Sequence, residues 1–74
     1  MERLLLILDD IRPDVDFKNE TRLISDGILD SFDIITIVEE INSKFEIDIK
    51  PKHLTADNFN SVESIWELIQ QLSK

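Results

Sequence analysis

Hydrophobic residues recur at a helical spacing near the start of this chain. Leu4, Ile7, Leu8 and Ile11 fall at positions i, i+3, i+4 and i+7, which places them on one face of a helix. Pro13 ends the pattern, because the residue before a proline disfavours the helical conformation. The spacing therefore predicts a first amphipathic helix that stops before Pro13.

A long and mostly polar stretch follows over residues 13–30. Its few hydrophobic residues are Val15, Phe17, Leu23, Ile24, Ile28 and Leu29. A connection of this length in so small a domain is usually functional. We therefore expect a long first loop that is anchored to the core by these side chains.

The second helix is predicted from about Ser31 to Phe45. At about 100° per residue, its apolar positions gather on one side, namely Ile34, Ile37, Val38, Ile41 and Phe45. The opposite side is polar, with Asp33, Thr36, Glu40, Ser43 and Lys44. Phe32 lies near the centre of the polar side, so we expect it to be exposed. Ile35 lies at one edge of the apolar stripe, where the pattern fits either core packing or contact with a partner.

Apolar and polar residues alternate over 45–50, which is a strand-like period of two. No second segment of this kind exists to pair with it. We therefore predict an extended linker that pins Ile47 and Ile49 to the core and stops at Pro51.

Two more helices are predicted after this linker. A short third helix is capped by Thr55 and ends near Phe59. Ser61 caps a final helix that has Glu63 in its first turn. The buried stripe of this last helix consists of Val62, Ile65, Trp66, Ile69 and Leu72. The predicted fold class is all-α: a small four-helix bundle with a short third helix and a long loop between helices 1 and 2, in a single domain over residues 1–74.

Composition limits the possible functions. The chain has 74 residues and no cysteine, so neither disulfides nor thiolate metal sites supplement a small core. Sixteen acidic residues against eight Lys and Arg give a net charge of −8. This charge argues against binding to nucleic acid or to anionic membranes, and it favours basic protein partners.

The first ten residues do not have the pattern of a signal peptide. The apolar run over residues 4–8 ends in two aspartates and lacks a small-residue cleavage site. No stretch approaches the roughly 20 apolar residues of a membrane span. We expect a cytoplasmic, monomeric protein without membrane insertion.

The side chains that often carry catalysis or bind metals are sparse. His53 is the single histidine and has no evident triad partner, so we expect an exposed loop histidine and no catalytic residue. Asp14 and Asp16 have the spacing of the first calcium-loop ligands, but Lys18 occupies the next alternate position and no glycine follows. Asp26 and Asp30 could meet across a turn. We nevertheless expect a solvated acidic surface and no metal site.

One octet, Asp26-Gly27-Ile28-Leu29-Asp30-Ser31-Phe32-Asp33, combines several unusual features. Gly27 is the only glycine in the chain and permits a turn with positive φ just before the second helix. Ser31 stands at the predicted helix start. One interpretation makes Ser31 only an N-cap, in an acidic helical module for protein interaction. The other makes its hydroxyl a site of modification, displayed at the positive end of the helix dipole.

The octet resembles the modification site of acyl and peptidyl carrier proteins. Asp30-Ser31-Phe32 is similar to the D-S-L core of that family, with phenylalanine in place of leucine. The resemblance extends through the second helix, the extended segment 45–49 and the stretch 54–65. It implies that Ser31 carries a 4′-phosphopantetheine arm, whose thiol holds acyl or aminoacyl groups as thioesters.

The resemblance also implies a set of partners. A magnesium-dependent phosphopantetheinyl transferase would attach the arm from coenzyme A, an acyl- or aminoacyl-loading ligase would charge it, and a downstream synthase or transferase would unload it. By analogy, such partners recognise the start and exposed face of the second helix. The residues expected to contact them are Asp30, Phe32, Asp33, Ile35 and Glu39.

The second helix departs from that of bacterial fatty-acid carriers. It has Thr36, Asn42 and Ser43 where those carriers have a denser acidic ladder, and Glu39 where they often have a hydrophobic contact. The resemblance therefore favours a dedicated stand-alone carrier of a biosynthetic or cell-envelope pathway over a housekeeping fatty-acid role.

Overall fold

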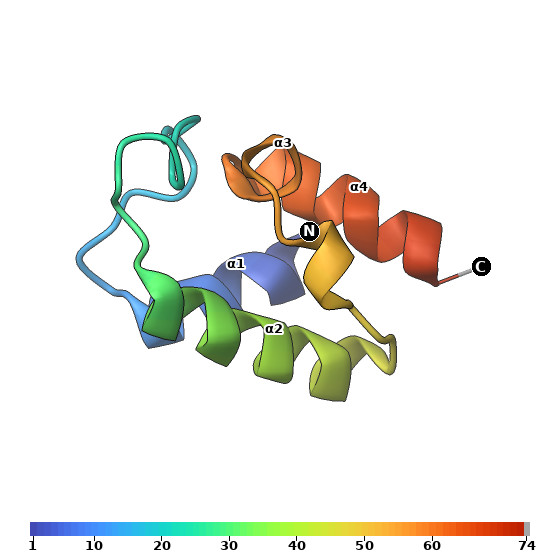
Figure 1. Ribbon diagram of the computed structural model, residues 1–74. Coiled ribbons are helices and arrows are strands. Elements are labelled where there is room, and N and C mark those ends of the chain that lie inside the picture. Colours follow the sequence, from blue (N-terminus) through green and yellow to red (C-terminus); the bar gives the residue numbers. More distant parts are fainter. Residues whose placement is uncertain (74) are drawn as a thin grey trace.

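Four α-helices and one 3₁₀ turn make up the regular structure of residues 1–73, which the computed structural model describes. The helices are α1 (Glu2–Ile11), α2 (Ser31–Phe45), α3 (Ala56–Phe59) and α4 (Val62–Leu72), and the 3₁₀ turn is η1 (Pro51–His53). Helix α1 packs against both α2 and α4, and α3 packs against α4 (Figure 1). These described residues contain no strand, so the predicted all-α class is confirmed.

The core forms where the apolar faces of α1, α2 and α4 meet. Its buried side chains are Leu4, Leu8, Phe17, Leu23, Leu29, Ile37, Ile41, Ile49, Phe59, Val62, Ile65, Leu68 and Ile69. The predicted stripe of α2 is confirmed, with Ile34, Val38 and Phe45 partly buried around Ile37 and Ile41. The face of α1 is rotated slightly from the prediction, because Leu5 packs on the core where Ile7 was expected. In α4 the pattern missed Leu68, which is buried.

Residues 47–50, between α2 and η1, form neither helix nor strand, and they hold Ile47 and Ile49 against the core as predicted, although Phe45 belongs to α2. Glu46 ends α2 in the left-handed conformation, with φ of 56°. The backbone N–H of Ile49 donates to Oδ1 of Asn42 at 2.8 Å, which holds the buried Ile49 against the end of α2. Pro51 stops the extended segment by starting η1, a short turn that the sequence did not reveal.

Side-chain caps start the last two helices where the sequence predicted them. The N–H of Asn58 donates to Oγ1 of Thr55 at 3.3 Å, at the start of α3. The N–H of Ser64 donates to Oγ of Ser61 at 3.1 Å, at the start of α4. These hydroxyls satisfy amide groups that would otherwise lack partners in the first helical turn.

The connection between α1 and α2 is fastened to the corner between α3 and α4. Oδ1 of Asn60 accepts hydrogen bonds from the backbone N–H groups of Ile24 at 2.9 Å and Ser25 at 3.0 Å. The carbonyl of Asn60 accepts a third, from the N–H of Leu23, at 3.0 Å. All six predicted anchors of the connection are buried or partly buried against the core. The residues before Ser31 therefore have a defined path.

Candidate functional site

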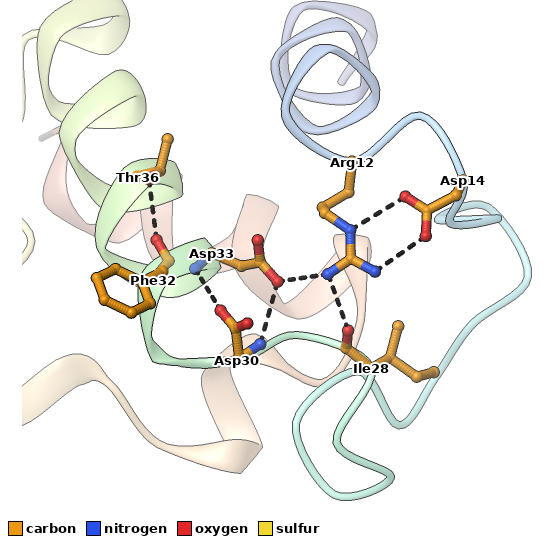
Figure 2. Close-up of polar contacts among 7 residues, drawn as sticks. All are labelled: Arg12, Asp14, Ile28, Asp30, Phe32, Asp33 and Thr36. Carbon is orange, nitrogen blue, oxygen red and sulfur yellow. Dashed lines mark hydrogen bonds and ion pairs between the residues drawn. The ribbon is translucent and has the colours of Figure 1, made fainter.

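The start of α2 is closed by a reciprocal pair of hydrogen bonds between two aspartates. Oδ1 of Asp30 accepts from the N–H of Asp33 at 2.9 Å, and Oδ2 of Asp33 accepts from the N–H of Asp30 at 3.1 Å. Figure 2 shows this pair bridging the first turn of the helix. It is a capping box in which Asp30 is the N-cap and Asp33 takes the third helical position.

Ser31 is therefore not the N-cap, and the interpretation that gave it only that role is wrong. It is the first residue of α2, one position inside the cap. Its side chain is exposed, and within residues 1–73 its hydroxyl makes no hydrogen bond. Since Asp30 provides the cap, the hydroxyl of Ser31 is not needed to start the helix.

A tight turn precedes the site, as the lone glycine predicted. Gly27 has φ of 69°, in the left-handed region that a residue with a Cβ adopts only at a cost. The N–H of Gly27 donates to the carbonyl of Ile24, and the N–H of Leu29 donates to the carbonyl of Leu23, both at 3.0 Å. Leu29 is buried, with 5% of its surface exposed. The backbone immediately before Asp30 is therefore fixed in place by these hydrogen bonds and by the buried Leu29.

Arg12 joins three segments beside this turn, and the sequence gave no indication of it. It follows the last residue of α1. Its Nε and Nη2 each donate to a different oxygen of Asp14, at 3.0 Å. Its Nη1 donates to the carbonyl of Ile28 at 3.2 Å and also to Oδ2 of Asp33 (Figure 2). The end of α1, the loop and the first turn of α2 thus meet at one guanidinium.

These contacts alter the titration of the paired groups. Hydrogen bonds from Arg12 lower the pKa of the Asp14 carboxyl below its ordinary value. Hydrogen bonds to Asp14 first and Asp33 second raise the pKa of Arg12 further above its ordinary value. Arg12 is therefore a permanent cation beside the first turn of α2.

Exposed hydrophobic side chains stand next to Ser31 on the outer face of α2. Phe32 is 81% exposed, as predicted, and Ile35 is 53% exposed one turn later. Core packing, one of the two interpretations of Ile35, is therefore wrong. Glu39 continues the same exposed face. The carboxylate of Asp33 differs from these, because its side chain is only 14% exposed and is held within the chain.

A small apolar pocket lies between the loop, α2 and α3. It is lined by Ile24, Ile34, Leu54, Thr55 and Phe59. Ile34 belongs to the first turn of α2, as Ser31 does, but Ser31 is not among the residues that line the pocket. Leu54 is 40% exposed, so part of this apolar lining faces solvent.

The remaining polar candidates make contacts within the chain. Nδ1 of His53 accepts from the N–H of Lys50 at 2.9 Å; this histidine is half-buried in η1, so its predicted exposed loop position is wrong. Asp16 accepts from Nδ2 of Asn19 at 2.7 Å, and Asp26 accepts from Nε of Arg22 at 3.0 Å. Within residues 1–73, no group of three or more His, Cys, Asp or Glu side chains is arranged to hold a metal ion.

Among the described residues, no helix has both the length and the apolar character required to cross a membrane. The chain matches no family model, no curated protein and no solved structure. The residues of the chain and their geometry are therefore the only indications of its function.

Proposed function

We propose that this chain is a stand-alone carrier protein that bears a 4′-phosphopantetheine arm on Ser31. It is not an enzyme itself. It presents acyl or aminoacyl thioesters to partner enzymes: a phosphopantetheinyl transferase, a loading ligase and a downstream synthase or transferase. In this proposal residues 1–74 form one carrier domain, a four-helix bundle in which the long first connection leads to the attachment site.

The observation that supports this proposal best is that the residue that caps α2 is not the residue that would carry the arm. Asp30 caps α2, and the adjacent Ser31 projects an exposed hydroxyl that has no partner within residues 1–73. An unpaired hydroxyl at a helix start can be approached by another protein. Its place at the positive end of the helix dipole suits a phosphodiester.

Ser31 provides the acceptor in a phosphoryl transfer. Its Oγ forms the new bond to the phosphorus of the arm as the nucleotide of coenzyme A leaves, and the hydroxyl proton passes to a base on the transferase. Positioning and charge stabilisation belong to that enzyme. The attached arm supplies a thiol for thioester formation, which this cysteine-free chain lacks.

The exposed face of α2 provides recognition. Phe32 and Ile35 give an apolar contact next to the attachment point, because both are largely exposed. Asp30 and Glu39 add negative charge for a basic partner, which the net charge of −8 also favours. Asp33 contributes to recognition indirectly, by holding the first turn of α2 in place, because its carboxylate accepts hydrogen bonds from Arg12 and from the backbone N–H of Asp30.

The departures noted in α2 support one class of pathway over another. Thr36 and Ser43 are exposed polar residues where a fatty-acid carrier would have acids. This surface favours a dedicated biosynthetic or cell-envelope pathway. An aminoacyl group is one cargo of such a pathway.

Intact-mass measurement tests the proposal directly. The purified chain is incubated with coenzyme A, magnesium and a broad-specificity phosphopantetheinyl transferase. We expect the mass to rise by one arm in the wild type and in Ser43→Ala, a control that removes an exposed serine from the same helix. We expect no rise in Ser31→Ala. An unmodified wild type, or a modified Ser31→Ala, would refute the assignment.

A protein-interaction module is the alternative, and the exposed Phe32 and Ile35 are the observation that favours it. In that case the same apolar contact binds a partner and no arm is needed. The wild type would then remain unmodified by the transferase.

A further inference from the structure

Arg12 makes a contact whose consequences reach Ser31. Of the contacts that its guanidinium makes, the pair with Asp14 faces solvent, since the Asp14 side chain is 65% exposed. The pair with Asp33 is more sheltered, since the two side chains are 28% and 14% exposed. A planar guanidinium can hold both carboxylates and a carbonyl at once, which a lysine ammonium cannot do in the same geometry.

We propose that Arg12 is a positioning residue for Ser31 and acts through the carboxylate of Asp33. This inference rests on the proposed carrier function and adds a residue to its site. Oδ2 of Asp33 accepts from both Arg12 and the N–H of Asp30. The guanidinium therefore fixes the side chain that closes the turn, and Ser31 lies inside that turn.

The carbonyl of Ile28 ties the same guanidinium to the other side of Ser31. Nη1 of Arg12 donates to this carbonyl at 3.2 Å, three residues before the serine. The chain is thus held at Ile28 and at Asp33, with Ser31 between these two points. Loss of Arg12 leaves the backbone contacts of Gly27 and Leu29 in place but releases the turn that orients the hydroxyl.

Charge gives Arg12 a second effect on the same site. Asp30 and Asp33 are both acidic neighbours of Ser31, and a phosphodiester adds a further negative charge. Arg12 offsets the charge of Asp33 at close range, in a partly sheltered pair that salt screens less than an exposed one. The phosphodiester of the arm would therefore face the uncompensated charge of Asp30 alone, because the charge of Asp33 is offset by Arg12.

The chain contains a matched control for this role. Arg22 pairs with Asp26 at 3.0 Å in the same connection, with side chains 65% and 51% exposed. Arg22→Gln and Arg12→Gln remove the same charge, but only Arg12→Gln removes a contact to α2. Arg12→Lys keeps the cation and loses the planar fork.

Loading kinetics with the transferase and coenzyme A measure the effect. We expect Arg12→Gln to lower kcat about tenfold or more with little change in KM, because a displaced nucleophile slows transfer without weakening docking. We expect Arg22→Gln to stay within about twofold of the wild type, and Arg12→Lys to recover part of the loss. Circular dichroism at the assay temperature establishes that every variant is folded.

A double-mutant cycle tests whether Arg12 acts through Asp33. Asp33→Asn keeps an oxygen that can accept from the N–H of Asp30 but removes the ion pair. If Arg12 acts mainly through Asp33, adding Arg12→Gln to Asp33→Asn lowers kcat by a clearly smaller factor than adding it to the wild type, because only the contact with the Ile28 carbonyl is left to lose. Fully additive losses would show that Arg12 acts by another route and would overturn the proposal.

Hydrogen exchange at the N–H of Asp33 gives a readout that does not need the arm. This N–H donates to Asp30 in the capping box, so Arg12→Gln should speed its exchange while Arg22→Gln should not. If the wild type is loaded, equal loading rates for Arg12→Gln and Arg22→Gln overturn the proposal. If the wild type accepts no arm, the carrier function is refuted instead. The hydrogen-exchange measurement still applies in that case, and an unchanged exchange rate at the N–H of Asp33 in Arg12→Gln would show that Arg12 does not order this turn.

Discussion

Substitution of two adjacent residues, Asp30 and Ser31, should have very different consequences for stability. Asp30→Ala removes the oxygen that accepts from the N–H of Asp33 at 2.9 Å. Loss of an N-cap costs about 1 kcal/mol, and loss of a negative charge at a helix N-terminus adds about 0.3–1 kcal/mol. We therefore expect Asp30→Ala to lower the free energy of unfolding by about 1–2 kcal/mol.

Ser31→Ala should leave stability almost unchanged. The hydroxyl makes no hydrogen bond within residues 1–73, and alanine is a better helix former than serine. We expect a change within about 0.5 kcal/mol, which is the usual range for exposed positions. In a domain of this size, each 1 kcal/mol shifts Tm by about 4–8 °C, so thermal scans separate the two variants.

Urea denaturation followed by circular dichroism and by the fluorescence of Trp66 is the appropriate assay. Trp66 packs edge-on against Phe45, with ring centroids 6.0 Å apart, so its emission reports the contact between α4 and α2. Asp30→Asn is the control, because asparagine caps as well as aspartate and only the charge is lost. Destabilisation by Ser31→Ala as large as that by Asp30→Ala would refute the assignment of the cap to Asp30 alone.

Three further predictions concern other positions. Phe32→Ala should change the free energy of unfolding by less than about 0.5 kcal/mol, because the side chain is 81% exposed. The same variant should raise the KM of the transferase. A loss of several kcal/mol in the free energy of unfolding would place Phe32 in the core. Glu46→Gly should stabilise the protein by up to about 1 kcal/mol, because it removes left-handed strain at φ of 56°; a lower Tm would contradict this. Asp14→Asn should be less stable than the wild type at neutral pH, and the difference should fade as pH falls below about 4. The folded-state pKa of Asp14 is depressed, so its contribution exists above the unfolded pKa and is lost as pH falls through the folded one; a difference that persists at pH 2 would exclude the ion pair as its cause.

The helices could be predicted from sequence because their apolar residues follow a strict period. The bounds of α2 agree with the prediction at both ends. The exposure of Phe32 follows from its place on the polar side of that helix, since a residue opposite the buried stripe has no neighbouring element to pack against. In α1, leucines and isoleucines are almost continuous, so the pattern could not decide which of them face the core. For that reason Ile7 was predicted on the buried face, whereas Leu5 packs there.

The identity of the cap was harder to predict. Asp30 and Ser31 are adjacent, and both residue types are good N-caps. A capping box is usually sought with Glu or Gln at the third helical position, and Ile34 occupies that position if Ser31 is the cap. The signal that distinguishes the two was Asp33, three residues after Asp30, because a shorter acid can also reach back to the cap amide.

Contacts between distant parts of the chain left no local signal. Arg12 meets Asp33 across 21 residues of sequence, and Asn60 meets Ile24 across 36. Arg12 and Asn60 are ordinary polar residues in their own segments. Only the packing of α1, α2 and α3 brings each of them to its partner. These two residues define the path of the loop, so the loop was predicted as an element but its shape was not.

The division of roles within the octet would allow one short segment to serve both folding and the proposed modification. If Ser31 were the cap, an arm on its oxygen would compete with the amide that this oxygen satisfies, and loading would weaken the start of α2. Asp30 takes the amide instead, and Arg12 balances the charge of Asp33. A phosphodiester on Ser31 would then add a negative charge at the N-terminus of the helix, where the dipole favours it, and would break no hydrogen bond. The geometry would thus allow an arm to be added to Ser31 without disturbing the first turn of α2.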